Sequence, residues 1–232
     1  MTKHIGIVAC SAEGASLCYR TICTEAPALL GRKYAHPEVT MHTPNFAEYM
    51  KHIESGDWRK IADLMLASAK KVAGAGADFA ICPDNTIHQS FDLFIAKSPI
   101  PWLHIAQVVA DEAKEKDYQR LGVLGTRFLV EGPVYRKKIE AAGIEYFIPG
   151  KADRERINTI ILDELVAGVF TDKSRAYFIK VISWLKGRGC DAVVLGCTEI
   201  PIIVTPESSP LPALDSTRLL ARAALKKAIE AA

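Results

Sequence analysis

Residues 189–199 read GCDAVVLGCTE, and residues 76–86 read GADFAICPDNT, with a glycine, an aspartate and an apolar run at the same places in both. Asp84 in the first segment lies over Cys197 in the second. Two more pairs follow the same order along the chain: GIVACS (6–11) with GVLGTR (122–127), and SPIPWL (98–103) with SPLPAL (209–214). The second half of the chain is therefore a faint copy of the first. We expect two similar lobes, with Asp84 and Cys197 facing one ligand from opposite sides.

The composition is that of an ordinary globular protein. The 232 residues include 49% hydrophobic and 24% charged residues, which is ample for a buried core. The formal net charge is +2 and no basic block occurs, so we expect no nucleic-acid partner. No apolar run approaches the roughly 20 residues that span a bilayer, so we expect no membrane partner. The first residues lack the profile of a signal peptide, which predicts a cytoplasmic location.

The six cysteines show no metal-binding pattern. No CxxC pair or Cys/His set with zinc spacing occurs, so we expect no metal site. In a chain without an export signal disulfides are not expected. Most of the thiols are predicted to be small buried apolar groups.

Short apolar runs alternate with longer amphipathic stretches. The predicted strands are 4–10, 39–43, 77–82, 102–105, 121–125, 145–148 and 192–196. The predicted helices are 15–30, 58–73, 107–115, 130–142, 154–169, 173–186 and 217–231. This alternation predicts an α/β fold with parallel sheets.

The repeat also predicts the domain organisation. We place one lobe at residues 1–98 plus 213–232 and the other at residues 99–212. The chain after Pro212 copies the first crossing between lobes, so the last helix is expected to return to the first lobe.

Ligands of parallel α/β sheets bind beyond the carboxyl ends of the strands. The polar or reactive side chains that follow predicted strands are Cys10, Ser11, Asp84, Asn85, Thr86, His104, Thr126, Cys197, Thr198 and Glu199. The pairs Asn85-Thr86 and Thr198-Glu199 look like helix starts, whose free N–H groups hold carboxylates well.

Most of these residues also have a purely structural interpretation. Asp84 is equally well placed to be a helix N-cap. Cys197 is either a small residue packed under a turn or a thiol whose pKa is lowered by the helix start. Cys82 is expected to be the last core residue of its strand, although a slip of one or two residues would make it the reactive group.

Three basic residues have similar alternatives. His88 is expected on a helix surface, and His104 is either a core imidazole or a group that lines the site. Arg156 is either a solvated charge at a helix start or a guanidinium that grips a substrate carboxylate through two hydrogen bonds.

Four ordered segments resemble the aspartate/glutamate racemase superfamily, particularly its broad amino-acid racemase branch. They are DNTIH (84–88), LGTR (124–127), RERIN (154–158) and LGCTEI (195–200), and the resemblance runs nearly end to end. It implies two Rossmann-like lobes related by a pseudo-twofold axis, with the active site in the cleft between them. It also implies a homodimer and a reaction that needs no cofactor.

The resemblance assigns roles to single residues. In the family two cysteines flank the substrate Cα; one removes the proton and the other protonates the opposite face. Cys197 matches the second cysteine, whereas Asp84 stands in place of the first, a position where some relatives carry threonine. Arg156 matches a basic residue that binds a substrate carboxylate. The other residues expected to bind the substrate are Ser11, Asn85, Thr86, Thr126, Thr198 and Glu199.

Two departures from the family bear on the chemistry: the turn at residues 9–14, and the aspartate at position 84 in place of cysteine. The turn at 9–14 reads ACSAEG, where the branch often reads GGMSWE, and this difference points to a changed substrate. An unperturbed aspartate has a pKa of about 3.9 against about 8.5 for cysteine. Asp84 is therefore a weak base unless burial or a nearby thiolate raises its pKa.

Three hypotheses follow. The first is an amino-acid racemase or epimerase that uses Asp84 and Cys197 on a substrate that is most simply an acidic amino acid. The second is a decarboxylase, lyase or isomerase that uses Cys197 alone. The third is a non-catalytic protein that binds amino acids.

Overall fold

The computed structural model describes residues 2–230, which form two compact units. The first unit holds the residues up to Ile105 and those from Thr217 onward, and the second is Ala106–Ser216. Residue 1 and residues 231–232, which we assigned to the first lobe, lie outside the described residues.

Both divisions fall a few residues beyond the predicted boundaries after residues 98 and 212. After each crossing the chain still pairs with the sheet it is leaving. The N–H of Ala80 donates to the carbonyl of Pro101, beyond residue 98 (2.8 Å), and Ala213–Asp215, beyond residue 212, pairs with Val193–Leu195.

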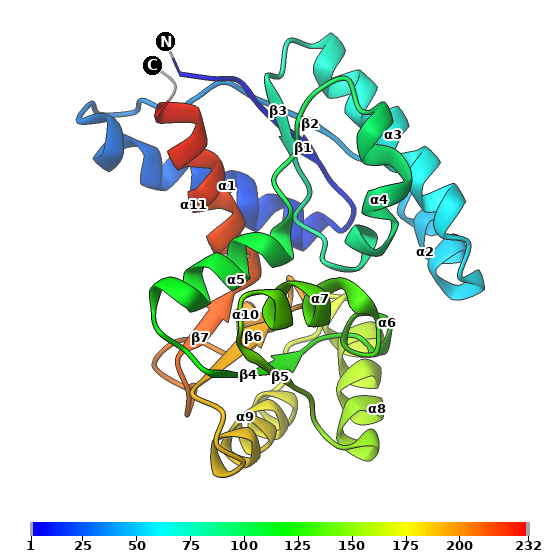
Figure 1. Ribbon diagram of the computed structural model, residues 1–232, viewed down its shortest axis with the longest axis vertical. Helices are drawn as coiled ribbons and strands as arrows, with labels where there is room; N and C mark the ends of the chain where they lie inside the picture. Colours follow the sequence, from blue (N-terminus) through cyan, green and yellow to red (C-terminus); the bar gives the residue numbers. More distant parts are fainter. Residues whose placement is uncertain (1, 231–232) are drawn as a thin grey trace. The chain divides into compact units, whose positions relative to one another are not determined.

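The first unit contains a parallel sheet in the order β2-β1-β3 (Figure 1). Its strands are β1 (Ile5–Val8), β2 (Val39–His42) and β3 (Phe79–Ile81). Its helices are α1 (Ala12–Leu30), α2 (Phe46–Ser55), α3 (Trp58–Gly74), α4 (Phe91–Phe94) and α11 (Ser216–Ile229), with 3-10 segments η1 (Thr86–Ser90) and η2 (Ile95–Lys97). Helices α1 and α11 lie side by side, joined by an ion pair between Glu25 and Arg222 (2.8 Å).

The second unit contains a parallel sheet in the order β5-β4-β6-β7 (Figure 1). Its strands are β4 (Arg120–Leu124), β5 (Glu145–Phe147), β6 (Ala192–Leu195) and β7 (Ala213–Asp215). Its helices are α5 (Ile105–Glu115), α6 (Arg127–Val130), α7 (Pro133–Ala141), α8 (Lys151–Ile160), α9 (Asp172–Gly187) and α10 (Ile200–Ile203), and α8 continues as a π-helical turn, η3 (Ile161–Leu165). The buried residues of α8, η3, α9, β6 and α10 form one apolar core.

The two units repeat the same packing between helix and strand. A Cβ added to Gly6 in β1 would lie 2.8 Å from Cγ2 of Val72 in α3. A Cβ added to Gly122 in β4 would lie 2.7 Å from Cδ1 of Leu185 in α9. At both places glycine lets a helix approach the central strand closely. The sequence repeat is thus a repeat of three-dimensional contacts.

The predicted α/β class with parallel sheets is confirmed, but three predicted elements were wrong in detail. Instead of a strand at 102–105 there is a single bridge between Ala80 and Trp102, and α5 begins at Ile105. The predicted helix 130–142 is split at Gly132, because Pro133 starts a new helix. The predicted helix 154–169 ends with the π-helical turn at Leu165.

Helix α2 was not predicted. The side chain of Asn45 caps it by accepting from the N–H of Ala47 (2.9 Å), and Gly56 ends it in the left-handed conformation.

No helix within residues 2–230 combines the length and the apolar character needed to cross a bilayer.

Candidate active-site residues in the two units

Asp84 follows β3 at the carboxyl end of the first sheet, and two hydrogen bonds hold its carboxylate. The hydroxyl of Tyr49 in α2 donates to Oδ1 (2.9 Å), and the N–H of Ile87 donates to the same oxygen (3.0 Å). The bond from Ile87 is the kind an N-cap makes, so Asp84 also anchors the start of η1. The structural interpretation of this residue therefore holds, without excluding a chemical role.

His88 stabilises the same turn through hydrogen bonds. The prediction that it lies on a helix surface was wrong. The residue is buried (4% exposed), and both ring nitrogens are satisfied by main-chain groups. The N–H of Ile105 donates to Nε2 (3.3 Å), so Nδ1 carries the proton and donates to the carbonyl of Asp84 (2.9 Å). The ring also packs against His104, with centroids 4.5 Å apart.

Two buried thiols lie beside Asp84. Cys10 follows β1 and Cys82 follows the neighbouring strand β3, and they are 2% and 0% exposed. A hydrogen bond to Cys82, then burial, then the charges of Cys82 and Asp84 raise the pKa of Cys10 well above its usual range. Cys10 is therefore a neutral thiol at neutral pH.

Tyr49 is also neutral. Burial first, and then the negative charge of Asp84, raise the pKa of the Tyr49 phenol well above its usual range. The hydroxyl thus keeps its proton and remains a donor to Asp84.

The other predicted residues of the first unit lie at the same edge of the sheet. Ser11 follows β1 and caps α1 by accepting from the N–H of Gly14 (3.3 Å). Asn85 is buried and Thr86 is half-buried at the start of η1. Ser11 and the Asp84–Thr86 turn therefore share the carboxyl ends of two adjacent strands.

Cys197 follows β6 at the carboxyl end of the second sheet. Its thiol donates to Oε2 of Glu199 (3.0 Å), and the hydroxyl of Thr198 donates to the same oxygen (2.8 Å). Glu199 is only 2% exposed, and these two donors help to offset the burial of its carboxyl group. Cys197 is half-buried. The arrangement places the Cys197 sulfur against a buried carboxyl group.

Gly196 positions Cys197 by bringing two strand ends into contact. Its N–H donates to the carbonyl of Leu124 at the end of β4 (2.8 Å). A Cβ at this residue would lie 2.8 Å from that carbonyl oxygen and 2.6 Å from Cδ2 of Leu129.

Replacing Gly196 with alanine is expected to lower the free energy of unfolding by about 1–3 kcal/mol, because the backbone oxygen cannot move aside. Chemical denaturation measures this, with Gly187→Ala as the matched control. A Cβ at Gly187 meets nothing within 4 Å, and alanine favours its helix, so the control should be neutral or stabilising. Equal stability of the two variants would contradict the packing described here.

Thr126 and Arg156 belong to the same unit as Cys197. Thr126 follows β4, the neighbour of β6, and its buried hydroxyl has no hydrogen-bond partner within residues 2–230. The N–H of Arg127 donates to the side chain of Asn158 (2.9 Å), which joins α8 to the turn after β4. Arg156 lies 3.9 Å from Glu164 of η3, and its side chain is 40% exposed. Arg156 thus has a carboxylate partner within the protein.

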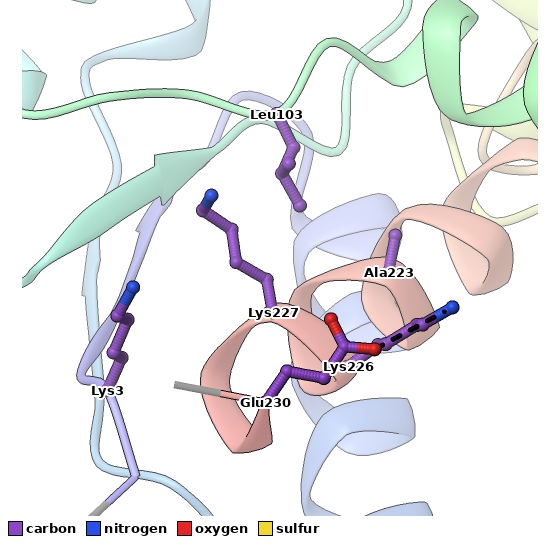
Figure 2. A pocket seen from close by; sticks show the side chains of 6 residues that line it. All are labelled: Lys3, Leu103, Ala223, Lys226, Lys227 and Glu230. Atoms are coloured by element: carbon purple, nitrogen blue, oxygen red, sulfur yellow. Dashed lines mark ion pairs between the residues drawn. The ribbon is translucent and has the colours of Figure 1, made fainter. Parts of the chain in front are cut away.

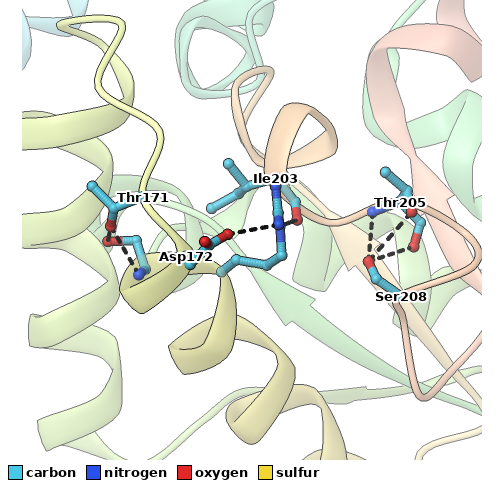
Figure 3. Close-up of polar contacts among 7 residues, drawn as sticks. Thr171, Asp172, Ile203, Thr205 and Ser208 are labelled. Atoms are coloured by element: carbon cyan, nitrogen blue, oxygen red, sulfur yellow. Dashed lines mark hydrogen bonds and ion pairs between the residues drawn. The ribbon is translucent and has the colours of Figure 1, made fainter.

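The helix that follows Glu199 is fixed at its far end (Figure 3). Arg175 of α9 donates from Nε to the carbonyl of Ile203 (3.1 Å) and from Nη1 to Asp172 (2.8 Å). Thr205 and Ser208 then close the next turn with mutual hydrogen bonds. This support holds α10 and, through it, the segment that carries Cys197.

A cavity of about 370 Å³ in the first unit is lined by none of the predicted site residues (Figure 2). Its lining residues are Lys3, Leu103, Ala223, Lys226, Lys227 and Glu230. Among residues 2–230 no three His, Cys, Asp or Glu side chains are grouped closely enough to hold a metal ion.

Comparisons with known proteins agree over nearly the whole chain. The family model described as Asp/Glu/Hydantoin racemase matches residues 7–224. A crystal structure of a candidate Asp/Glu racemase from Yersinia pestis is 31% identical, with a TM-score of 0.87, and covers 98% of this chain and 99% of that one. An aspartate racemase homologue from Pyrococcus horikoshii OT3 is 27% identical, with a TM-score of 0.82 and the same coverage. The broad specificity amino-acid racemase RacX of Bacillus subtilis is 22% identical over 183 residues, 78% of this chain and 75% of RacX.

Proposed function

The chain belongs to the Asp/Glu/hydantoin racemase family, and we propose that it is an amino-acid racemase or epimerase in which Asp84 and Cys197 exchange the Cα proton. The proposed reaction needs no cofactor. The homodimer, the pseudo-twofold axis, the cleft and the cytoplasmic location stay predictions.

One observation carries the proposal: the two residues at equivalent positions of the repeat have complementary hydrogen-bonding states. Asp84 accepts from Tyr49 and Ile87, as an ionised carboxylate does. Cys197 donates to Glu199, as a protonated thiol does. These contacts support a resting pair of one base and one acid, which is what proton transfer to opposite faces of one carbon requires.

The mechanism follows from this pair. Asp84 removes the α-proton from one face, negative charge develops on the substrate carboxylate, and Cys197 protonates the other face. The Thr126 hydroxyl and the N–H groups at the start of η1 are the donors we assign to this charge. The product leaves a protonated Asp84 and a Cys197 thiolate, the form that the other enantiomer requires.

The two forms of the pair differ in free energy. Ordinary pKa values of about 3.9 and 8.5 place the form with protonated aspartate and thiolate about 6 kcal/mol above the resting form. A catalyst cannot change the equilibrium, so kcat/KM is equal for the two enantiomers. We expect kcat and KM to differ individually between the two directions.

The proposed substrate is an acidic amino acid. Arg156 is the residue we assign to a substrate carboxylate, and it would exchange its contact with Glu164 for the ligand. The relatives include aspartate racemase homologues and a broad specificity enzyme, so the substrate test must cover many amino acids.

Proton exchange at Cα tests the proposal directly. Both enantiomers of each of the common amino acids are incubated with the protein in D2O and followed by NMR, with Cys197→Ser as the control. We expect loss of the Cα–H signal and inversion for both enantiomers of aspartate or glutamate. Absence of exchange with every amino acid tested would overturn the proposed function.

A second candidate is a one-sided proton-transfer enzyme, a decarboxylase, lyase or isomerase. The observation that favours it is the contact network of Cys197, Thr198 and Glu199, which forms within one unit and needs no second base. Release of CO2 or ammonia without exchange of either enantiomer would select this candidate.

A further inference from the structure

Helix α2 contributes a buried side chain to the surroundings of Asp84. Tyr49 is 3% exposed, and its ring stacks on Phe46 of the same helix with centroids 5.7 Å apart. Its hydroxyl is directed at Oδ1 of Asp84, 2.9 Å away. A buried tyrosine whose polar end meets a carboxylate from another element is placed to control that carboxylate.

The hydrogen bond acts on both the charge and the orientation of Asp84. A donor to a carboxylate favours the ionised form. Oδ1 receives two donors, the Tyr49 hydroxyl and the Ile87 N–H, and these occupy both lone pairs of that oxygen. The position of Oδ1 is thus fixed by two elements, α2 and the start of η1.

We propose that Tyr49 is a positioning residue for the reaction, which keeps the Asp84 carboxylate ionised and fixes its orientation through the Oδ1 atom. This inference rests on the proposed function. Tyr49 acts through Asp84 and not by contact with the reacting carbon.

Several titratable groups of the first unit lie near Asp84. They are Tyr49 of α2, Cys10 after β1, Cys82 after β3 and His88 of η1. Cys10 keeps its proton, because its pKa is raised by the contact with Cys82 and by burial. His88 binds the main-chain carbonyl of Asp84 rather than its carboxylate. Tyr49, in contrast, donates directly to the carboxylate.

The test is Tyr49→Phe, which keeps the ring and removes the hydroxyl. Loss of a donor to the charged form raises the pKa of Asp84, so the acidic limb of the profile of kcat against pH should move upward by about one pH unit. At a pH on this acidic limb, kcat of the variant should be roughly tenfold lower than kcat of the unmutated protein, while KM changes little. The matched control is Tyr146→Phe, which removes a buried hydroxyl that donates to the carbonyl of Val130 in the second unit.

A second readout does not depend on activity. The carboxyl carbon of Asp84, labelled with ¹³C and assigned by its loss in Asp84→Asn, is titrated by NMR in the unmutated protein and in both tyrosine variants. We expect a higher pKa of Asp84 in Tyr49→Phe and an unchanged one in Tyr146→Phe. An equal pKa in all three proteins would overturn the inference. An inactive protein in which Tyr49→Phe still raises this pKa would overturn the proposed function instead, leaving the control of Asp84 by Tyr49 established.

Discussion

Cys197→Ala is expected to stop the interconversion of enantiomers, with kcat lower by about 10²–10⁴-fold, because one face of the substrate loses its acid. Exchange of the α-proton with D2O should survive for a single enantiomer. That enantiomer presents its Cα–H to Asp84, which can still remove the proton and return a deuteron to the same face. The variant should therefore exchange without inverting.

The matched control for this prediction is Cys190→Ala. Cys190 is another cysteine of the second unit, and burial raises its pKa to about 11, so it is an inert core thiol. Its replacement by alanine should leave the rates of inversion and exchange close to those of the unmutated protein. Undiminished inversion by Cys197→Ala, measured by NMR and by chiral chromatography, would contradict the role given to this thiol.

The internal repeat explains why the fold class was predictable. The copies place glycines at the same points of the central strands, and at these points side chains of α3 and α9 pack directly against the strand backbone. The wrong prediction of a strand at 102–105 comes from the same repeat. Its counterpart, β7, pairs with β6 along three residues, whereas the first copy keeps only the bridge at Trp102. A repeat predicts where a segment lies, but not how far its pairing extends.

Helix α2 carried a signal that was available from the sequence. Phe46, Tyr49, Met50 and Ile53 have helical spacing, and Asn45 and Gly56 are typical start and stop residues. The contact of Tyr49 with Asp84, in contrast, could not be predicted from the sequence pattern. It joins residues far apart in the sequence, and depends on how α2 packs beside the sheet.

The surroundings of the two principal residues were predictable to different degrees. Placing Asp84 and Cys197 at strand ends needs only the apolar runs before them, and both do follow strands. The burial of His88 follows from hydrogen bonds to Asp84 and Ile105, which no periodic pattern reveals. Likewise, Cys197 and Thr198 both donate to Glu199, and these contacts depend on side-chain conformations that the sequence does not reveal.

Asp84→Asn is expected to lower kcat for inversion by about 10²–10⁴-fold, because an amide of nearly the same shape cannot act as a general base. Tyr49 and Ile87 can still donate to the amide oxygen, so the turn should keep its structure. The remaining exchange depends on the Cys197 thiolate and should therefore rise with pH as the thiol loses its proton. It should be confined to the enantiomer that Cys197→Ala does not exchange.

Asp57→Asn is the matched control, since Asp57 caps α3 by accepting from the N–H of Lys60 (3.1 Å) and takes no part in the proposed reaction. The decisive measurement is deuterium exchange of each enantiomer by Asp84→Asn, Cys197→Ala and the control Asp57→Asn. Opposite residual enantiomers in Asp84→Asn and Cys197→Ala require two groups that act on opposite faces of the carbon. The same residual enantiomer in both variants would mean that these groups do not flank the carbon, and the proposed mechanism would fail.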